Sequence, residues 1–174
     1  VRALFESEVK ANPITDAEER KTAVHDYMLR FSIVAAVFGA FPVPVFSILT
    51  DLFVISIQVK VVRDIGQFWG HKVDREAARS ILGSIVGATG MRIAVHSVLN
   101  VVPILGSALG AASAFATTWA LGKVADAYFS ANGHLDAAVL RKLYGEAREE
   151  AREVYEKSRH LIAARLHNGK KPPG

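Results

Sequence analysis

The sequence contains no cysteine, and this absence excludes disulfide bonds and thiolate metal sites. The spacings of other known sites are also missing. No histidines have the H-x-x-x-H or H-E-x-x-H spacing of a zinc site, and no Gly-x-x-x-x-Gly-Lys-Ser/Thr loop is present. No hydroxyl residue has a base at a recognisable spacing. We therefore expect no enzymatic activity, no cofactor and no metal.

The basic residues do not form a nucleic-acid-binding pattern. The net charge is +4, but Lys and Arg are interleaved with Asp and Glu and lack an aromatic platform, so we expect no nucleic-acid partner. A basic chain suits an anionic membrane surface, although many soluble proteins are equally basic. The segment from Val1 to Asp26 contains several acidic residues and no continuous apolar stretch, so we expect no secretion signal.

Charge is absent from two long stretches, and each of them contains proline. One stretch runs from Phe31 to Thr50, and the other covers the thirty residues between Arg92 and Lys123. Proline lacks a backbone N–H and disfavours helix in the residue before it. Each stretch should therefore fold as two apolar helices joined at a turn. The sequence predicts two proline-tipped apolar helical hairpins.

The arms of these hairpins are short for a membrane protein. The predicted tips consist of Pro42, Val43 and Pro44 in the first hairpin and Pro103 and Ile104 in the second. The arm from Phe31 to Phe41 has eleven residues. As a helix it would be about 16 Å long, roughly half of the hydrocarbon core of a bilayer. Such a hairpin is able to enter one leaflet or to lie inside a protein, but one arm cannot span a membrane.

Capping residues and helix breakers set the remaining boundaries of an all-α fold. We expect helices over about 16–41, 45–69, 75–102, 103–129 and from 136 onward. Thr15 and Glu18 have the spacing of a capping box, and Asp74 precedes the third helix as a possible cap. Gly70 and Gly133 follow predicted helix ends. The later half of the second helix, which carries Gln58, Lys60, Arg63 and Asp64, is expected to have a polar face.

The chain divides into four segments by composition. We expect an N-terminal segment over 1–15, a double helical-hairpin domain over 16–133, a C-terminal amphipathic helical region over 134–167 and a disordered tail over 168–174. The C-terminal region has a seam at alternating four- and three-residue steps, typical of a long amphipathic helix that packs on one partner. This seam consists of Ala147, Ala151, Val154, Ser158, Leu161 and Arg165.

Small residues recur at four-residue steps after the second tip. This stripe consists of Gly106, Gly110, Ala114 and Thr118. Small side chains on one helix face allow a neighbouring backbone to approach closely, as in helix pairs within membranes. The same stripe would also serve to pack a helix inside a soluble bundle. The sequence leaves both interpretations open: an oligomer surface in lipid, or packing within one chain.

Three polar residues lie within the apolar arms. Asp51 is in the first hairpin, and His96 and Asn100 share a helix face near the second tip. Polar groups in such places are costly without partners and are often functional in membranes. The two hypotheses are hydrogen-bonded structural groups and a path for ions or protons.

Several of these segments in order resemble a known family. They are Phe38-Gly-Ala-Phe-Pro-Val-Pro-Val45, Phe68-Trp-Gly-His-Lys-Val-Asp-Arg-Glu-Ala-Ala-Arg79 and Val102-Pro-Ile-Leu-Gly-Ser-Ala-Leu-Gly-Ala111. Over roughly Ala23 to Glu150 the chain resembles the YcjF-like domain of unknown function, family 697, which is related to EcsC-type proteins and is found attached to bacterial GTPase domains. The resemblance implies a membrane-associated bacterial domain that works beside a GTPase. Since this sequence has no GTPase domain, the GTPase would be a separate protein.

These observations together favour a membrane-associated, self-assembling helical scaffold or membrane-remodelling protein without catalytic activity. We expect it on the cytoplasmic side of a membrane, either the inner membrane or an internal compartment. Its expected partners are a lipid membrane, further copies of the same chain and the separate GTPase. One alternative is a soluble helical subunit of a homo-oligomer or larger complex. The other is an oligomeric channel.

Overall fold

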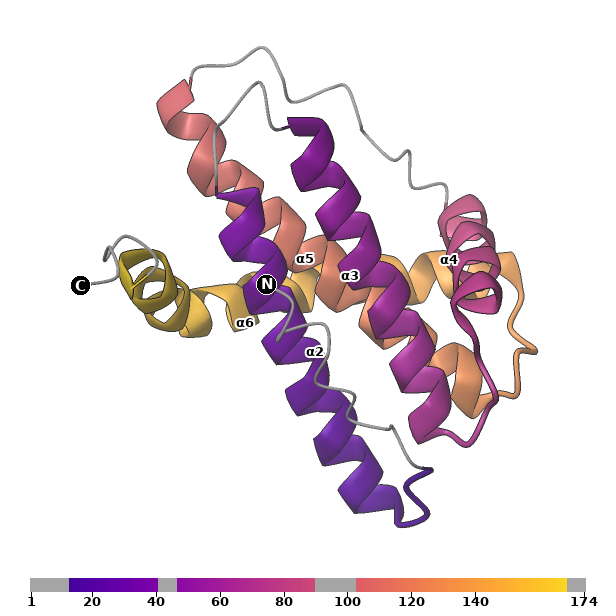
Figure 1. Cartoon of the computed structure of the whole chain (residues 1–174). Coiled ribbons are helices and arrows are strands. Elements are labelled where there is room, and N and C mark those ends of the chain that lie inside the picture. The colour runs from indigo at the N-terminus through magenta and orange to yellow at the C-terminus, as the bar shows by residue number, and fades with distance from the viewer. Residues whose placement is uncertain (1–12, 41–46, 90–102, 169–174) are drawn as a thin grey trace.

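The computed structural model describes residues 13–40, 47–89 and 103–168, and these ranges contain five α-helices and no strand (Figure 1). The helices are α2 (Ala17–Gly39), α3 (Ser47–Phe68), α4 (Arg75–Thr89), α5 (Pro103–Ser130) and α6 (Ala137–Asn168). The prediction of an all-α fold with a long C-terminal helix is confirmed. The predicted continuation of the third helix over 90–102 lies outside the described residues.

The helices form a bundle around α5. α2 and α3 run antiparallel beside each other, and α5 packs against both of them and against α6 (Figure 1). α4 packs on α3 and α6 at the edge of the bundle. The two arms of the second predicted hairpin, α4 and α5, are thus consecutive in the sequence but have their main packing partners on other helices.

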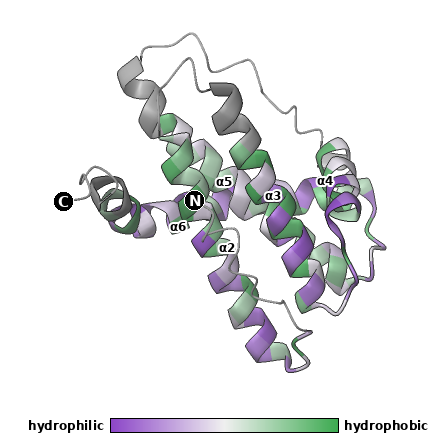
Figure 2. Cartoon of the chain, viewed as in Figure 1, coloured by the Kyte–Doolittle hydropathy of each residue, from purple (hydrophilic) through white to green (hydrophobic). Residues whose placement is uncertain are grey.

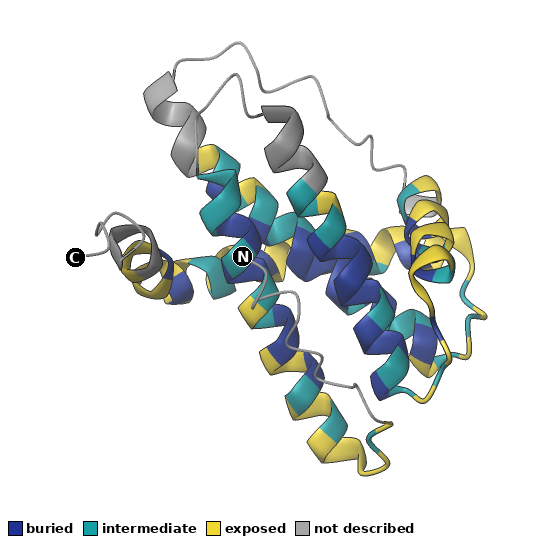
Figure 3. Cartoon of the chain, viewed as in Figure 1, coloured by how far each residue is buried: buried dark blue, intermediate teal, exposed yellow. Residues whose placement is uncertain are grey.

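The core is centred on α5 and the second half of α3. The largest fully buried side chains include Phe115, Leu121 and Trp119 from α5 and Ile57 and Ile65 from α3 (Figure 3). α5 carries no charged residue before Lys123, so it can be enclosed by neighbours on several sides without burying an unpaired charge. This composition accounts for its central position.

Capping residues set the starts of α2 and α4, and one of the two predicted caps differs in the structure. The N-cap of α2 is Asp16, whose Oδ1 accepts a hydrogen bond from the Glu19 backbone N–H at 2.7 Å, so the predicted capping box starting at Thr15 is wrong. A carboxylate one position later serves the same purpose and also complements the helix dipole. Asp74 caps α4 as predicted, accepting from the Ala77 N–H at 2.7 Å.

Glycines in the left-handed region follow two of the helices. Gly70 has a φ of 82° just after α3, and Gly133 has a φ of 80° after α5. A residue with a Cβ is strained in this conformation, which explains why glycine occupies both positions. These two predicted helix ends therefore follow from the left-handed backbone conformation that glycine adopts without strain.

The buried seam of α6 departs from the predicted one toward its end. Ala147, Ala151 and Ser158 are buried as the pattern indicates. Farther along, Ile162 is buried, whereas Leu161 is 43% exposed. A straight helix has 3.6 residues per turn, so a seam drawn with a repeat of 3.5 moves off the contact face within a few turns. The prediction for Leu161 is wrong for this reason.

Candidate functional site

A buried ionic cluster joins α2 to α3. It consists of Tyr27 from α2 and Lys60, Arg63 and Asp64 from α3. Asp64 is 1% exposed and Lys60 is 9% exposed. Asp64 Oδ2 accepts hydrogen bonds from Lys60 Nζ at 2.6 Å and from the Tyr27 hydroxyl, and Oδ1 accepts from Arg63 Nε at 2.7 Å. Both carboxylate oxygens are therefore occupied.

The environment of the ionic cluster keeps the Tyr27 hydroxyl protonated. Burial raises the Tyr27 pKa far above its ordinary value of 10.0, and the negative charge of Asp64 and the hydrogen bond to it raise this pKa further. Tyr27 is therefore a fixed donor to Asp64. A buried carboxylate is tolerated when it is paired and hydrogen-bonded, and here three side chains from two helices satisfy it.

The ionic cluster corrects the prediction of a polar face on the second helix. Gln58, Lys60 and Asp64 are all buried, so these residues face the protein interior. One signal in the sequence pointed to this result. Lys60 and Asp64 stand four positions apart, within pairing distance on a helix, and are surrounded by Val59, Val61, Val62 and Ile65. The hydrogen bond from the Tyr27 hydroxyl to Asp64, which is 37 positions away, had no such signal in the sequence.

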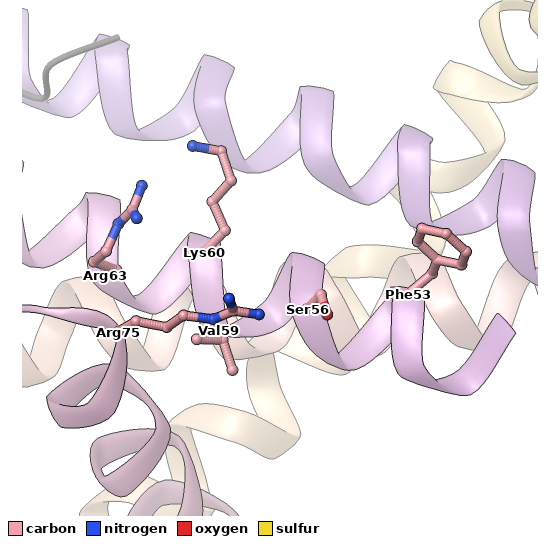
Figure 4. Close-up of a pocket in the computed structure, with 6 residues that line it drawn as sticks. All are labelled: Phe53, Ser56, Val59, Lys60, Arg63 and Arg75. Atoms are coloured by element: carbon pink, nitrogen blue, oxygen red, sulfur yellow. The ribbon is translucent and has the colours of Figure 1, made fainter. Parts of the chain in front are cut away.

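A pocket of about 400 Å³ adjoins the ionic cluster between α3 and the start of α4. Figure 4 shows the side chains that line it, which are Phe53, Ser56, Val59, Lys60, Arg63 and Arg75. Lys60 and Arg63 contribute both to the pocket and to the ionic cluster. The pocket therefore has a cationic part beside Asp64 and an apolar part near Phe53.

Three helix ends lie together at one end of the bundle, which we call the apolar end. This apolar end consists of the C-terminal part of α2 and the N-terminal parts of α3 and α5 (Figure 1). Figure 2 shows the described residues becoming hydrophobic in this direction. The rings of Phe38 and Phe53 stack there with centroids 5.4 Å apart. Leu109 is 62% exposed and Ile55 is 37% exposed, so large apolar side chains face outward.

The small-residue stripe of α5 packs against α2 of the same chain. A Cβ added to Gly39 would lie 2.6 Å from the Gly110 carbonyl oxygen and 2.8 Å from the Ala114 Cβ, and one added to Gly110 would overlap the Gly39 carbonyl. Thr118 is buried. Gly122 continues the stripe by one more step, and a Cβ there would lie 2.6 Å from Met28 Sδ. The structure thus packs Gly110 and Ala114 of the stripe against α2 and buries Thr118, and Gly122 is a member that the sequence analysis missed.

The other predicted site residues fall at the edge of the described part of the chain or beyond it. Pro103 is the first residue of α5 and Ile104 follows it, while Gly106 and Asp51 lie in α5 and α3. Pro42, Val43, Pro44, His96 and Asn100 lie outside the described residues. The proposed path for ions or protons through Asp51, His96 and Asn100 therefore stays a prediction.

Two features are absent from the described residues. Across residues 13–40, 47–89 and 103–168, no group of three or more His, Asp or Glu side chains is arranged to hold a metal ion. As far as their described residues extend, none of the five helices combines the length and apolar character that a membrane crossing requires.

Comparison with known proteins identifies a relative in Synechocystis. The chain is 32% identical over 126 residues to the Synechocystis protein named "Uncharacterized protein sll0481", an alignment that covers 68% of this chain and 77% of that protein. The chain belongs to the sll0481 family. No family model matches the chain, and no solved structure matches it. Membership of the sll0481 family assigns no activity, and the resemblance to the YcjF-like domain stays a prediction.

Proposed function

We propose that this member of the sll0481 family is a membrane-associated helical scaffold that attaches to one face of a membrane through its apolar end. The observation that carries the proposal is the exposure of Leu109 at the place where α2, α3 and α5 converge. Three separate helices present their apolar ends together there. A convergence of this kind can enter one leaflet without any helix crossing the membrane.

The charge distribution along the helices supports this orientation. α2 has no charged residue after Arg30, and α5 has none before Lys123. The segments of α2 and α5 nearest the apolar end can therefore approach hydrocarbon without carrying charge into it, whereas α3 carries one charged residue, Asp51, near its start. Burying one leucine side chain contributes about 1.5–3 kcal/mol, so several exposed apolar side chains acting together are sufficient for reversible binding.

Self-assembly and a separate GTPase complete the proposal. The small-residue stripe is occupied by α2, so contacts between copies would use another surface. The start of α6 offers one, because Val139 is an exposed apolar side chain there. The GTPase partner and the bacterial cytoplasmic location rest on the resemblance to the YcjF-like domain. The protein would act by organising the membrane and its partner, without catalysing a reaction.

One observation favours the alternative of a soluble helical subunit. Gly110 and Ala114 of the stripe that would pair helices in lipid already pack against α2 of the same chain, as they would in an ordinary soluble bundle. In that case the apolar end would be covered by another copy or by a larger complex. The two proposals differ in what contacts Leu109.

A flotation assay with phosphatidylcholine vesicles tests the proposal. A charge placed at the depth of a membrane segment costs about 2.5–3.5 kcal/mol, somewhat less near the interface, so Leu109→Asp should reduce vesicle binding at least tenfold. Leu161→Asp is the matched control, because Leu161 is a similarly exposed leucine on α6, away from the apolar end. Its vesicle binding should equal that of the wild type.

The same variants distinguish the alternative. Circular dichroism should show equal helix content for both, because both side chains are exposed. If Leu109→Asp leaves flotation unchanged but dissociates an oligomer in a light-scattering measurement, the apolar end contacts protein and the membrane proposal is wrong.

A further inference from the structure

The pocket between α3 and α4 has more positive than negative charge. Lys60, Arg63 and Arg75 line it, and Asp64 is the carboxylate that pairs with the first two. Since Asp64 has one negative charge, the three cations leave an excess of two positive charges. An excess of this size beside an open volume of about 400 Å³ favours an anionic occupant.

Arg75 is the cation that is free to serve such an occupant. Among the residues that the structure describes, it makes no ion pair. Its acidic neighbour Asp74 is engaged in capping α4 through the Ala77 N–H, and its other neighbour, Glu76, is exposed to solvent. Figure 4 shows the Arg75 side chain beside Val59, within the group that lines the pocket.

Arg75 is the first residue of α4, a helix of fifteen residues. The Asp74 carboxylate caps this helix end and compensates part of its positive charge. The attraction for an anion therefore comes from the guanidinium group of Arg75 and not from the helix end.

The remaining lining residues indicate what kind of anion fits. A guanidinium group binds phosphate oxygens in a bidentate manner, which a lysine cannot do. Phe53 and Val59 add an apolar surface, and Phe53 stacks on Phe38 at the apolar end of the bundle. The pocket volume falls within the roughly 300–1,000 Å³ typical of small-molecule sites. A phosphate group with an attached apolar chain matches both parts of the pocket.

We propose that the pocket between α3 and α4 binds a phosphate-bearing anion through Arg75, while Lys60 and Arg63, which are bound to Asp64, contribute positive charge to the same pocket. The anion is either a phosphate monoester at the head of a lipid or free phosphate. Phe53 belongs to the apolar end, but the cationic part of the pocket does not, and the proposal does not depend on insertion of the apolar end into a membrane.

Titration calorimetry on the full chain in detergent-free solution tests this site without vesicles. The probes are a short-chain, water-soluble phosphatidic acid below its micelle concentration and inorganic phosphate. We expect saturable binding of one equivalent by the wild type. Arg75→Gln should weaken binding about fivefold, the effect of one basic residue close to an anionic group, and Arg75→Glu should abolish it.

Arg79→Gln is the matched control, because Arg79 is an exposed arginine one turn later on α4 that does not line the pocket. Its affinity should equal that of the wild type. Arg75 makes no ion pair among the described residues, so its variants should not lower the melting temperature or the helix content. A change in affinity is then not a consequence of unfolding.

The two probes separate the possible sources of the phosphate group. Tighter binding of phosphatidic acid than of phosphate assigns a lipid headgroup with its chain on Phe53 and Val59. Equal affinities assign the free anion, and both results support the site. Absence of saturable binding for both probes, or binding that Arg75→Glu leaves unchanged, would overturn the proposal.

Discussion

Helix α2 contacts α3 and α5 by different chemical means. Toward α3 it offers Tyr27, which reaches a buried carboxylate held by two cations. Toward α5 it offers Gly39, which lies against Gly110 with no room for a Cβ. The first contact depends on a directional network that must be complete, and the second depends on the closeness of two backbones. Charge fixes how α2 and α3 are aligned, whereas small residues fix how near α2 and α5 approach.

A third kind of contact occurs at the end of the bundle that lies farthest from the apolar end, where α2 begins and α3 and α5 end. Trp69 Nε1 donates to Asp126 Oδ1 at 2.7 Å, and the Arg20 guanidinium lies 4.0 Å from the centroid of the Trp69 ring. These groups are partly exposed, so water competes for them and each contributes less than a buried pair. The bundle therefore changes along its length from polar contacts at this end to apolar and glycine contacts at the other.

The largest effect is expected from breaking the buried ionic cluster. Asp64→Leu removes the acceptor of Lys60 and Tyr27 and leaves a buried charge without a partner. The free energy of unfolding should fall by about 3–5 kcal/mol, measured by urea denaturation at neutral pH. Glu146→Leu is the control, because Glu146 forms an exposed pair with Lys142 at 3.8 Å and should cost less than about 0.5 kcal/mol.

A double variant sharpens this test. Lys60→Met combined with Asp64→Leu removes both buried charges and should recover much of the loss, since two apolar side chains replace an ion pair. If Asp64→Leu alone lowers stability by less than about 1 kcal/mol, the cluster does not hold α2 and α3 in the way described.

A smaller effect is expected from Tyr27→Phe. This change removes one hydrogen bond to the Asp64 carboxylate and should lower the free energy of unfolding by about 1.5–3 kcal/mol at neutral pH. The difference should depend on pH. The Tyr27 pKa is raised in the folded state, so its stabilising contribution is complete below the ordinary tyrosine pKa of 10.0 and is lost as the pH rises above it.

Urea denaturation at about pH 8 and about pH 11 measures this dependence, on either side of the ordinary tyrosine pKa. The wild type should lose more stability between the two values than Tyr27→Phe does. Equal losses in the two proteins would show that the folded state does not protect the Tyr27 hydroxyl from ionisation.

The smallest effect is expected at the glycine contact, where two substitutions should have opposite signs. Gly110→Ala places a Cβ against the Gly39 backbone, which cannot move aside as a flexible side chain would. Overpacking of this kind should lower the free energy of unfolding by about 1–3 kcal/mol. Gly83→Ala on α4 meets no atom within 4 Å and should raise it by about 0.5–1 kcal/mol through helix propensity. Thermal melting of both variants measures the two signs, and a stabilising Gly110→Ala would contradict the close contact.

Much of the fold was predictable because its signals are local. Proline and glycine mark the breaks, and Asp74 is visible in the sequence as a cap. The prediction of Thr15 as the cap of α2 was wrong by one position because Thr15 and Asp16 are both good caps, and only the backbone decides between them.

The candidate site was less predictable. The pocket brings Arg75 from the start of α4 to residues of α3, and the ionic cluster brings Tyr27 to Asp64. The sequence analysis assigned Lys60 and Asp64 to a polar face, although their four-residue spacing among apolar neighbours was a signal of a buried pair. Periodicity describes which residues share a helix face, and it does not say which helix covers that face.

The sequence by itself determined that this protein is all-α, where its helices break and which stretches are free of charge. Hydrogen bonds within a helix join residues four positions apart, so short segments carry that information. Only the tertiary structure decided that the small-residue stripe packs on α2, that Lys60 and Asp64 are buried and that Arg75 lines a pocket with them. These outcomes depend on which helices meet, and that choice is made by packing among residues tens of positions apart.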